Sequence, residues 1–150
     1  MAESVREQAL DQIKTLLAGM TGTRFWGGAY ANAPTVERIF KTPVQVNQFP
    51  HLCVIEDSGS TFTPSAFAGR WDHRFRVVLY GWVQGDDLTT RSTWLQRLQQ
   101  DVRRTLVPQD TLGGLAVRIE WAEEETDEGA MEPIGAFAQG LAVELHESVT

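Results

Sequence analysis

The sequence is poor in the features that anchor or cross-link a protein. Among its 150 residues there is one cysteine, Cys53, so no intramolecular disulfide can form, as is typical of proteins made in a reducing cytoplasm. No apolar run approaches the roughly 20 residues that span a bilayer, and the N-terminal MAESVREQAL lacks the basic and apolar regions of a signal peptide. We therefore expect no membrane association, and a stability that comes from packing or assembly.

Positive charge is also scarce. Lys and Arg number 13 against 20 Asp and Glu, which gives a net charge of −7. Affinity for nucleic acid depends on clustered Lys and Arg, so a broad nucleic-acid-binding face is not expected. The hydrophobic content of 42% and the charged content of 22% are ordinary for globular proteins, and the length suits one domain over residues 1–150.

Motifs for catalysis and metal binding are missing. The spacings HxxxH, CxxC and HxH do not occur, so no metal site is predicted. His51, His73 and His146 fall at the ends of predicted strands, where we expect surface histidines. A small ligand-binding or enzymatic domain that uses His51 with Asp72 and His73, or His51 with Cys53, is the less favoured alternative, because no third orienting group is indicated. The prediction is a non-enzymatic protein with no catalytic residue and no cofactor.

Two glycine pairs raise the question of a nucleotide site. Gly27-Gly28 and Gly113-Gly114 lack the following Lys and helix that phosphate-binding loops require. Gly113-Gly114 instead precedes an alternating apolar and polar stretch, so we predict that it supplies positive φ in a turn from helix to strand.

Two amphipathic helices and several strands are present in the pattern. Ser4 and Glu7 form a capping box at the start of a helix over residues 4–20. A second helix begins after Asp87 and ends at Pro108, with this buried stripe: Leu88, Arg91, Leu95, Leu98, Val102 and Leu106. Strands are predicted over residues 36–40, 50–56, 73–82, 116–122 and 137–146. This order predicts an α+β fold, with two helices packed on one face of a mostly antiparallel (mixed) β-sheet of four to five strands.

Two long loops are predicted to carry aromatic residues. Residues 21–34 hold three aromatics without a period, and residues 57–71 are rich in Ser, Thr and Gly. Loops of this length are usually functional or ordered by a partner. Because Trp is enriched in interfaces as well as in cores, the five tryptophans favour assembly. The candidate intersubunit loop residues are Phe62, Phe67, Arg70 and Trp71.

An acidic run follows the fourth predicted strand, over residues 123–129. It lacks the alternating ligands and central glycine of a calcium-binding loop, so a solvated hairpin loop is favoured over a site for a hard cation. Repeated around a ring, such a loop would make a strongly negative surface, or it could meet arginines of a neighbour's second helix. The candidate partner or lumen residues are Glu123, Glu124, Glu125, Asp127 and Glu128.

The element order, with the stretches FPHLCVIED and DTLGGLAVRIEWAEEETDEGAMEPIGAFAQGLAVELH, resembles the tail terminator (tail completion) proteins of long-tailed bacteriophages. In that family a helix closes with an acidic turn and Leu-Gly-Gly before a strand, and a polar loop and a last alternating strand follow. The resemblance covers about Val5 to His146 and is strongest over Leu95 to Leu145. The aromatic segment 21–34 departs from the pattern.

The resemblance implies a structural virion protein at the head-proximal end of the tail, made in the host cytoplasm. Such a protein forms a ring, typically a hexamer, that caps the tail tube, ends its polymerisation and joins the tail to the head through a neck or connector protein. DNA passes through its channel without specific binding. Another head-tail connector or tail-assembly protein of similar fold is the second interpretation.

Overall fold

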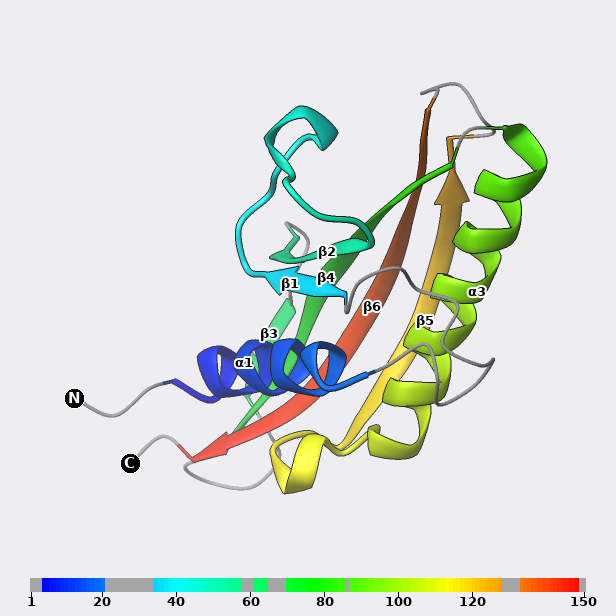
Figure 1. Ribbon diagram of the computed structural model, residues 1–150. Coiled ribbons are helices and arrows are strands. Elements are labelled where there is room, and N and C mark those ends of the chain that lie inside the picture. The colour runs from blue at the N-terminus through cyan, green and yellow to red at the C-terminus, as the bar shows by residue number, and fades with distance from the viewer. Residues whose placement is uncertain are drawn as a thin grey trace.

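The structure is a twisted β-sheet with two α-helices on one face (Figure 1). This computed structural model describes residues 4–20, 34–57, 61–64, 70–85, 87–127 and 133–148. Five strands lie in the order β1-β2-β4-β6-β5, and β3 pairs with β4 beside this path. The predicted α+β class, with two helices on one face of a mixed sheet, is confirmed. The predicted aromatic loop lies outside the described residues over 21–33.

Two long strands form the centre of the sheet. β4 (Arg70–Gln84) and β6 (Ile134–Ser148) are antiparallel and pair continuously from Arg70 with Ser148 to Gln84 with Ile134. Both are longer than the predicted strands 73–82 and 137–146. Near the end where Gln84 pairs with Ile134, Gly81 lies opposite Phe137, and a Cβ on Gly81 would fall 2.0 Å from a carbon of the Phe137 ring. The glycine therefore lets that aromatic ring lie across the neighbouring strand.

The other strands attach to this central pair. β2 (His51–Glu56) is antiparallel to β4, as predicted, and the short β1 (Thr35–Glu37) is parallel to β2, which makes the sheet mixed. β5 (Arg118–Thr126) pairs with the other side of β6 and forms one edge of the sheet. The prediction of an unstructured loop over 57–71 is wrong, because β3 (Thr61–Pro64) forms a hairpin with the start of β4.

The helices form where their local signals predict them. α1 (Val5–Ala18) begins at the capping box, in which the Ser4 hydroxyl accepts from the Glu7 amide at 3.2 Å and the Glu7 carboxylate accepts from the Ser4 amide at 2.9 Å. α3 (Leu88–Leu106) is capped by the Asp87 carboxylate, which accepts from the Thr90 amide at 2.7 Å. Of the described helices, none is long and apolar enough to cross a membrane.

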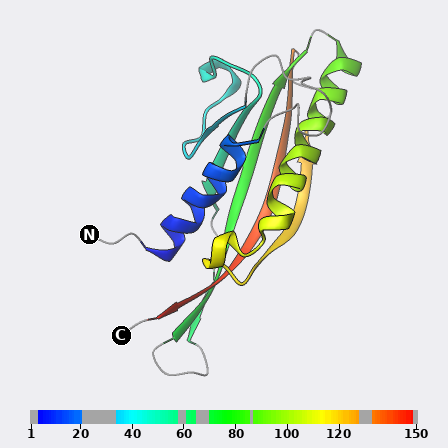
Figure 2. The same ribbon diagram turned by 60° about the horizontal axis from the view of Figure 1, so that its bottom comes forward.

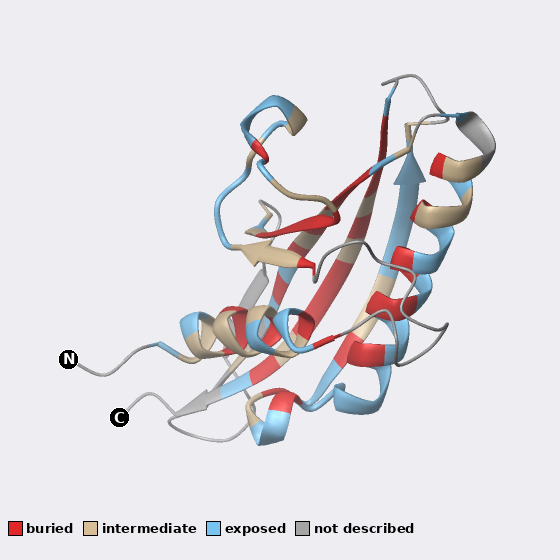
Figure 3. Cartoon of the chain, viewed as in Figure 1, coloured by how far each residue is buried: buried red, intermediate tan, exposed pale blue. Residues whose placement is uncertain are grey.

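The main core lies between the helices and the sheet. Figure 3 shows the buried residues of α3 on the side that faces the strands. The predicted stripe of α3 is confirmed for Arg91, Leu95, Leu98, Val102 and Leu106, all of which are buried. From the sheet, alternate residues of β4 (Phe75, Val77, Leu79 and Val83) and of β6 (Phe137, Leu141, Val143 and Leu145) join this core.

A compact turn leads from α3 back to the sheet. It consists of two short 3-10 helices, η2 (Val107–Gln109) and η3 (Leu112–Gly114). Gly113 and Gly114 have φ values of 69° and 96°, which confirms the predicted role of the pair in a turn with positive φ. Leu112 is buried there and fixes the turn against the core.

The opposite face of the sheet carries a second, smaller apolar cluster. The connection between β1 and β2, residues 38–50 with the 3-10 helix η1 (Pro43–Gln45), folds over one end of this face. The Trp82 indole N–H donates to the Lys41 carbonyl at 3.0 Å, and the Phe40 ring packs edge-on against Tyr80. Trp94 and Trp121 are partly buried against the main core, so the three tryptophans with described side chains contribute to packing within the chain.

Leu98 provides a test of the core. Leu98→Ala is expected to lower the free energy of unfolding by roughly 2–5 kcal/mol, because the side chain is completely buried between α3 and the sheet. The measurement is denaturant unfolding followed by circular dichroism. Gln100→Ala, an exposed position on the same helix, is the control and should change stability by no more than about 0.5 kcal/mol. Equal effects at the two positions would contradict the packing described here.

Candidate functional site: the acidic edge strand and the groove beside it

The acidic run lies mostly in a strand and not in a loop. Glu123, Glu124 and Glu125 belong to β5, which extends to Thr126, so the predicted strand 116–122 and loop 123–129 are wrong at this boundary. All three side chains are exposed. Asp127 follows directly, and its carboxylate accepts from the Ala136 amide at 3.2 Å, which closes the strand end against β6. Glu128 lies outside the described residues.

A β-bulge changes which face the acidic residues occupy. Trp121 pairs with Leu141 but Glu124 pairs with Gln139, so β5 holds one extra residue in this interval. The buried Gln139 side chain donates to the Ala122 carbonyl and to the Gly140 carbonyl, at 2.9 Å each. These two bonds satisfy backbone groups at the bulge. The bulge shifts by one residue the alternation of side chains between the two faces of the sheet. The side chain of Glu124 therefore lies on the face that the helices cover.

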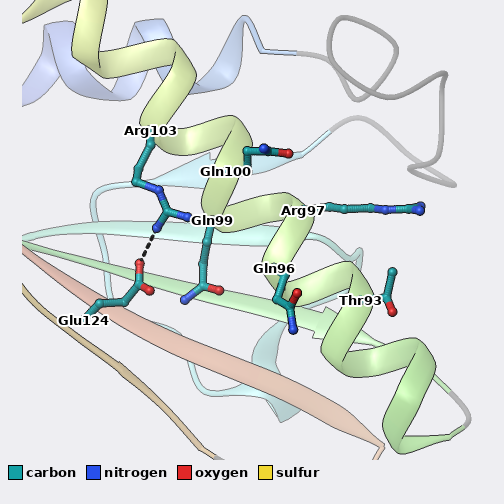
Figure 4. A pocket seen from close by; sticks show the side chains of 7 residues that line it. All are labelled: Thr93, Gln96, Arg97, Gln99, Gln100, Arg103 and Glu124. Atoms are coloured by element: carbon teal, nitrogen blue, oxygen red, sulfur yellow. Dashed lines mark hydrogen bonds and ion pairs between the residues drawn. The ribbon is translucent and has the colours of Figure 1, made fainter.

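Glu124 meets α3 on that face. Its carboxylate lies 2.8 Å from the Arg103 guanidinium, and both side chains are partly exposed (Figure 4). An exposed pair of this kind contributes little stability by itself. The contact does show that an arginine of the second helix, expected as a partner for a neighbour's acidic loop, pairs with the acidic run of its own chain.

A polar groove lies between α3 and β5. We call it the α3–β5 groove; it has a volume of about 420 Å³ and is lined by Thr93, Gln96, Gln99, Gln100, Arg103 and Glu124, with Arg97 at its rim. Gln99 is 6% exposed, and Figure 4 shows its side chain pointing from α3 toward the sheet. Its Nε2 is buried and has no hydrogen-bond partner among the described residues. The sequence offered no signal for this groove, because Gln99 differs from its neighbours only through its burial.

The open face of the sheet carries a network of ion pairs. Arg74 lies 2.6 Å from Glu120 and 3.5 Å from Glu144. Arg118 lies 2.8 Å from Glu120 and 3.1 Å from Glu144, and the carboxylate of Glu144 raises the pKa of Arg118. The four side chains come from β4, β5 and β6 and alternate in sign, so they bridge three strands without making a charged patch of one sign.

The predicted intersubunit residues lie in and around the β3 hairpin. Phe62 is in β3, where it pairs with His73, and Arg70 and Trp71 begin β4; Phe67 lies outside the described residues. The ends of β3, β4 and β6 extend past both helices (Figure 2). We call this projection the β3 arm and define it as Thr61–Pro64 with the paired ends of β4 and β6.

His51 is not the surface histidine that was predicted. It is 3% exposed, because β1 pairs beside it and places the Thr35 hydroxyl 2.6 Å from its Nδ1. Burial lowers the pKa of His51 below its usual 6.5. His146 is exposed, as predicted, and pairs with Asp72.

The structure separates His51 from Asp72 of the alternative enzymatic site and buries Cys53 beside His51 in β2. His51 pairs with Trp82 near one end of β4, whereas Asp72 is ten positions away along the same strand, which is about 33 Å at roughly 3.3 Å per residue. Cys53 is buried, and that burial raises the pKa of its thiol, which disfavours the reactive thiolate. Among the described residues, no group of three or more potential metal ligands is present.

An apolar projection was missed in the sequence. Ile39, Phe40 and Val44 are 62%, 47% and 95% exposed, and all lie in the segment 38–50. The segment was predicted to begin as a strand and continue as a turn. Its few apolar residues follow no helical or strand period, so the sequence did not indicate that they are exposed. Exposed apolar side chains gathered in one place are typical of contact surfaces.

Comparisons with known proteins give the fold but no family. No protein-family model matches the chain, and no curated protein is similar to it in sequence. Among solved structures, the chain is similar to a chain described as "Virion of native gene transfer agent (GTA) particle". The TM-score is 0.61 at 10% sequence identity, and the match covers 97% of this chain and 100% of that chain. The two chains therefore share their fold over their whole lengths.

His51 provides a test by pH. The unfolded chain binds its proton near pH 6.5, whereas the folded chain resists protonation, so the free energy of unfolding should fall as the pH drops from 7 to 5.5. The fall due to this one group is at most about 1.4 kcal/mol over the unit below pH 6.5. His51→Gln removes the titrating ring and should flatten the profile, measured by urea unfolding at each pH.

The matched control for the pH profile is His146→Gln. This change leaves the buried ring of His51 in place, so the fall in stability should persist. The hydrogen bond to Lys41 lowers the pKa of Glu37 below its usual 4.5, so Glu37 changes the stability only at pH values below the range of 5.5 to 7 that is measured. A His51→Gln profile as steep as that of the unmodified chain would show that another group controls the response.

Proposed function

We propose that this chain is a structural virion protein that forms a ring, most simply a hexamer, at the head-proximal end of a phage tail. The ring caps the tail tube, ends its polymerisation and joins the tail to the head through a neck or connector protein. The observation that carries the proposal is the likeness of the fold, over the full length of both chains, to a chain from a virion particle. The resemblance of the sequence to tail terminator proteins supplies the position within the virion.

The surface of the protein supports a structural role. It has a polar groove beside an edge strand, an arm of strands that extends past the helices, and an exposed apolar projection at Ile39 and Val44. Three different surfaces of this kind suit a subunit that contacts a neighbour on each side and a further protein along the tail axis. A ring closes when one surface of each subunit binds a different surface of the next by a fixed rotation.

The charge of the protein supports passage of DNA without specific binding. The net charge is −7, and the exposed acidic side chains of β5 lie next to one another on an edge of the sheet. A surface of this sign repels phosphate and releases no counterions on contact with DNA. We further propose that the protein is not an enzyme and needs no cofactor.

Electron microscopy tests the proposed ring. Purified protein, alone and mixed with the tail tube protein of the same phage, should give rings with a central hole, and the rings should sit on tube ends. Tubes polymerised with the protein should also be shorter than tubes without it. The proposal would be overturned if the protein stayed monomeric at low and at high concentration, also in the presence of the tube protein.

The second interpretation, another head-tail connector or tail-assembly protein, predicts different partners. Pull-down with the tagged full chain against tail tube protein and against portal-proximal proteins separates the two. Retention of the tube protein supports the tail terminator, and retention of portal-proximal proteins alone supports a connector.

Charge reversal on β5 tests the place of the acidic edge. Glu123→Lys with Glu125→Lys should change the free energy of unfolding by no more than about 0.5 kcal/mol per substitution, because both side chains are exposed. If these residues face the lumen or a partner, the variant should form fewer rings, or rings that retain DNA in a filter-binding assay. Asp110→Lys, an exposed reversal outside β5, is the control. An unfolded double variant would contradict the exposed placement of the two residues.

A further inference from the structure

The α3–β5 groove contains a hydrogen-bond donor without an acceptor. Gln99 is more than nine-tenths buried, and within the part of the chain that the structure describes its Nε2 has no partner. Buried polar groups are nearly always paired in native proteins, and each exception calls for an explanation. The side chain points into the space between α3 and the sheet (Figure 4). Because Nε2 is closed to solvent in this conformation, the amide has to turn toward the groove for an acceptor of a second molecule there to satisfy it.

The groove runs beside a strand edge. β5 pairs with β6 on one side, and its other side is the edge of the sheet. Such an edge presents alternating backbone N–H and C=O groups to an added strand. A strand edge flanked by a helix is an arrangement that accepts an extended segment, with backbone hydrogen bonds along the strand and side-chain contacts along the helix. The polar lining suits backbone and hydroxyl groups and does not suit the apolar projection of Ile39 and Val44.

The same chain carries a strand of the required kind. β3 is antiparallel to β4, and among the described strands no other pairs with its outer edge. It lies in the β3 arm, which extends past α1 and α3 (Figure 2). Pro64 at the end of β3 has no N–H, which limits any further pairing to the residues before it. The carbonyl groups on the outer edge of β3 are suitable acceptors for a side-chain amide.

We infer that the α3–β5 groove of one subunit receives the β3 arm of a second copy as an added strand on β5, with a backbone carbonyl of β3 accepting from Gln99 Nε2. The contact joins two different surfaces of the chain, so it is head-to-tail and repeats from subunit to subunit. It rests on the proposed function, because the ring supplies the second copy, and it names the surfaces that form the ring.

Disulfide trapping between two differently tagged chains tests the contact. One chain carries Ala122→Cys or Thr126→Cys on β5, and the other carries Phe62→Cys or Thr63→Cys on β3, so that both faces of each strand are sampled. The native Cys53 is buried and does not compete. The chains are mixed under assembling conditions, oxidised with oxidised glutathione and separated on a non-reducing gel. At least one β3–β5 pair should give a mixed disulfide well above background.

The control pair places a cysteine at the 95%-exposed Val44 of one chain and at Ala122 of the other, and it should stay at background. If electron microscopy shows rings but none of the four β3–β5 pairs forms a disulfide, the proposed contact is overturned and the proposed function stands. A specific disulfide without tube capping would support the contact and overturn the tail terminator role. Thermal melting of each cysteine variant confirms that it is folded.

Gln99 gives a second and independent readout. Gln99→Met is similar in length and removes the unpaired donor, so the isolated subunit should melt at the same temperature or higher. Assembly should nevertheless need about 5- to 10-fold more protein, because one hydrogen bond is lost at each contact. Mass photometry over a dilution series measures this shift, with the exposed Gln109→Met as control. Assembly of Gln99→Met at the unmodified concentration would show that the groove does not hold the arm.

Discussion

The pairing of β4 with β6 is the constraint on which the rest of the structure depends. The two strands stay in one antiparallel register from Arg70–Ser148 to Gln84–Ile134. Every other strand attaches to one of them directly or through β2, and both helices pack on alternate residues of the pair. A shift of one residue would exchange the apolar and polar faces of both strands, so burial of Phe75, Leu79 and Leu141 fixes the register. The length of the pair also carries the sheet beyond the helices and so creates the β3 arm.

The bulge in β5 sets the chemistry of the edge. Without the extra residue, the alternation that buries Ile119 beneath the helices would turn Glu124 to the open face. Gln139 holds the bulge by donating to the Ala122 carbonyl, and this bond is possible because Gln139 itself lies on the helix face. Glu124 can then reach Arg103 of α3. One buried amide thus supports the bulge that places a carboxylate on the β5 side of the α3–β5 groove.

The elements that the sequence predicted well are those with local signals. The capping box at Ser4, the apolar stripe around Leu98 and the glycine pair at Gly113 each act within a few residues, and each is found as predicted. The errors concern contacts between distant segments. β3 lacks an apolar alternation because its structure comes from pairing with β4, and the bulge depends on Gln139 across the strand. His51 is buried by β1, a strand that is too short to show a period.

The α3–β5 groove could not be predicted from the sequence. Its polar lining affects which contacts between subunits are favourable. An exposed apolar edge would pair with any copy it met, whereas a bulged strand with exposed acidic residues resists indiscriminate pairing. A net charge of −7 adds repulsion between free subunits. A contact made of backbone hydrogen bonds and one buried amide gains little until geometry is correct at every subunit. The proposed contact therefore discriminates between the correct head-to-tail approach of two subunits and any other approach.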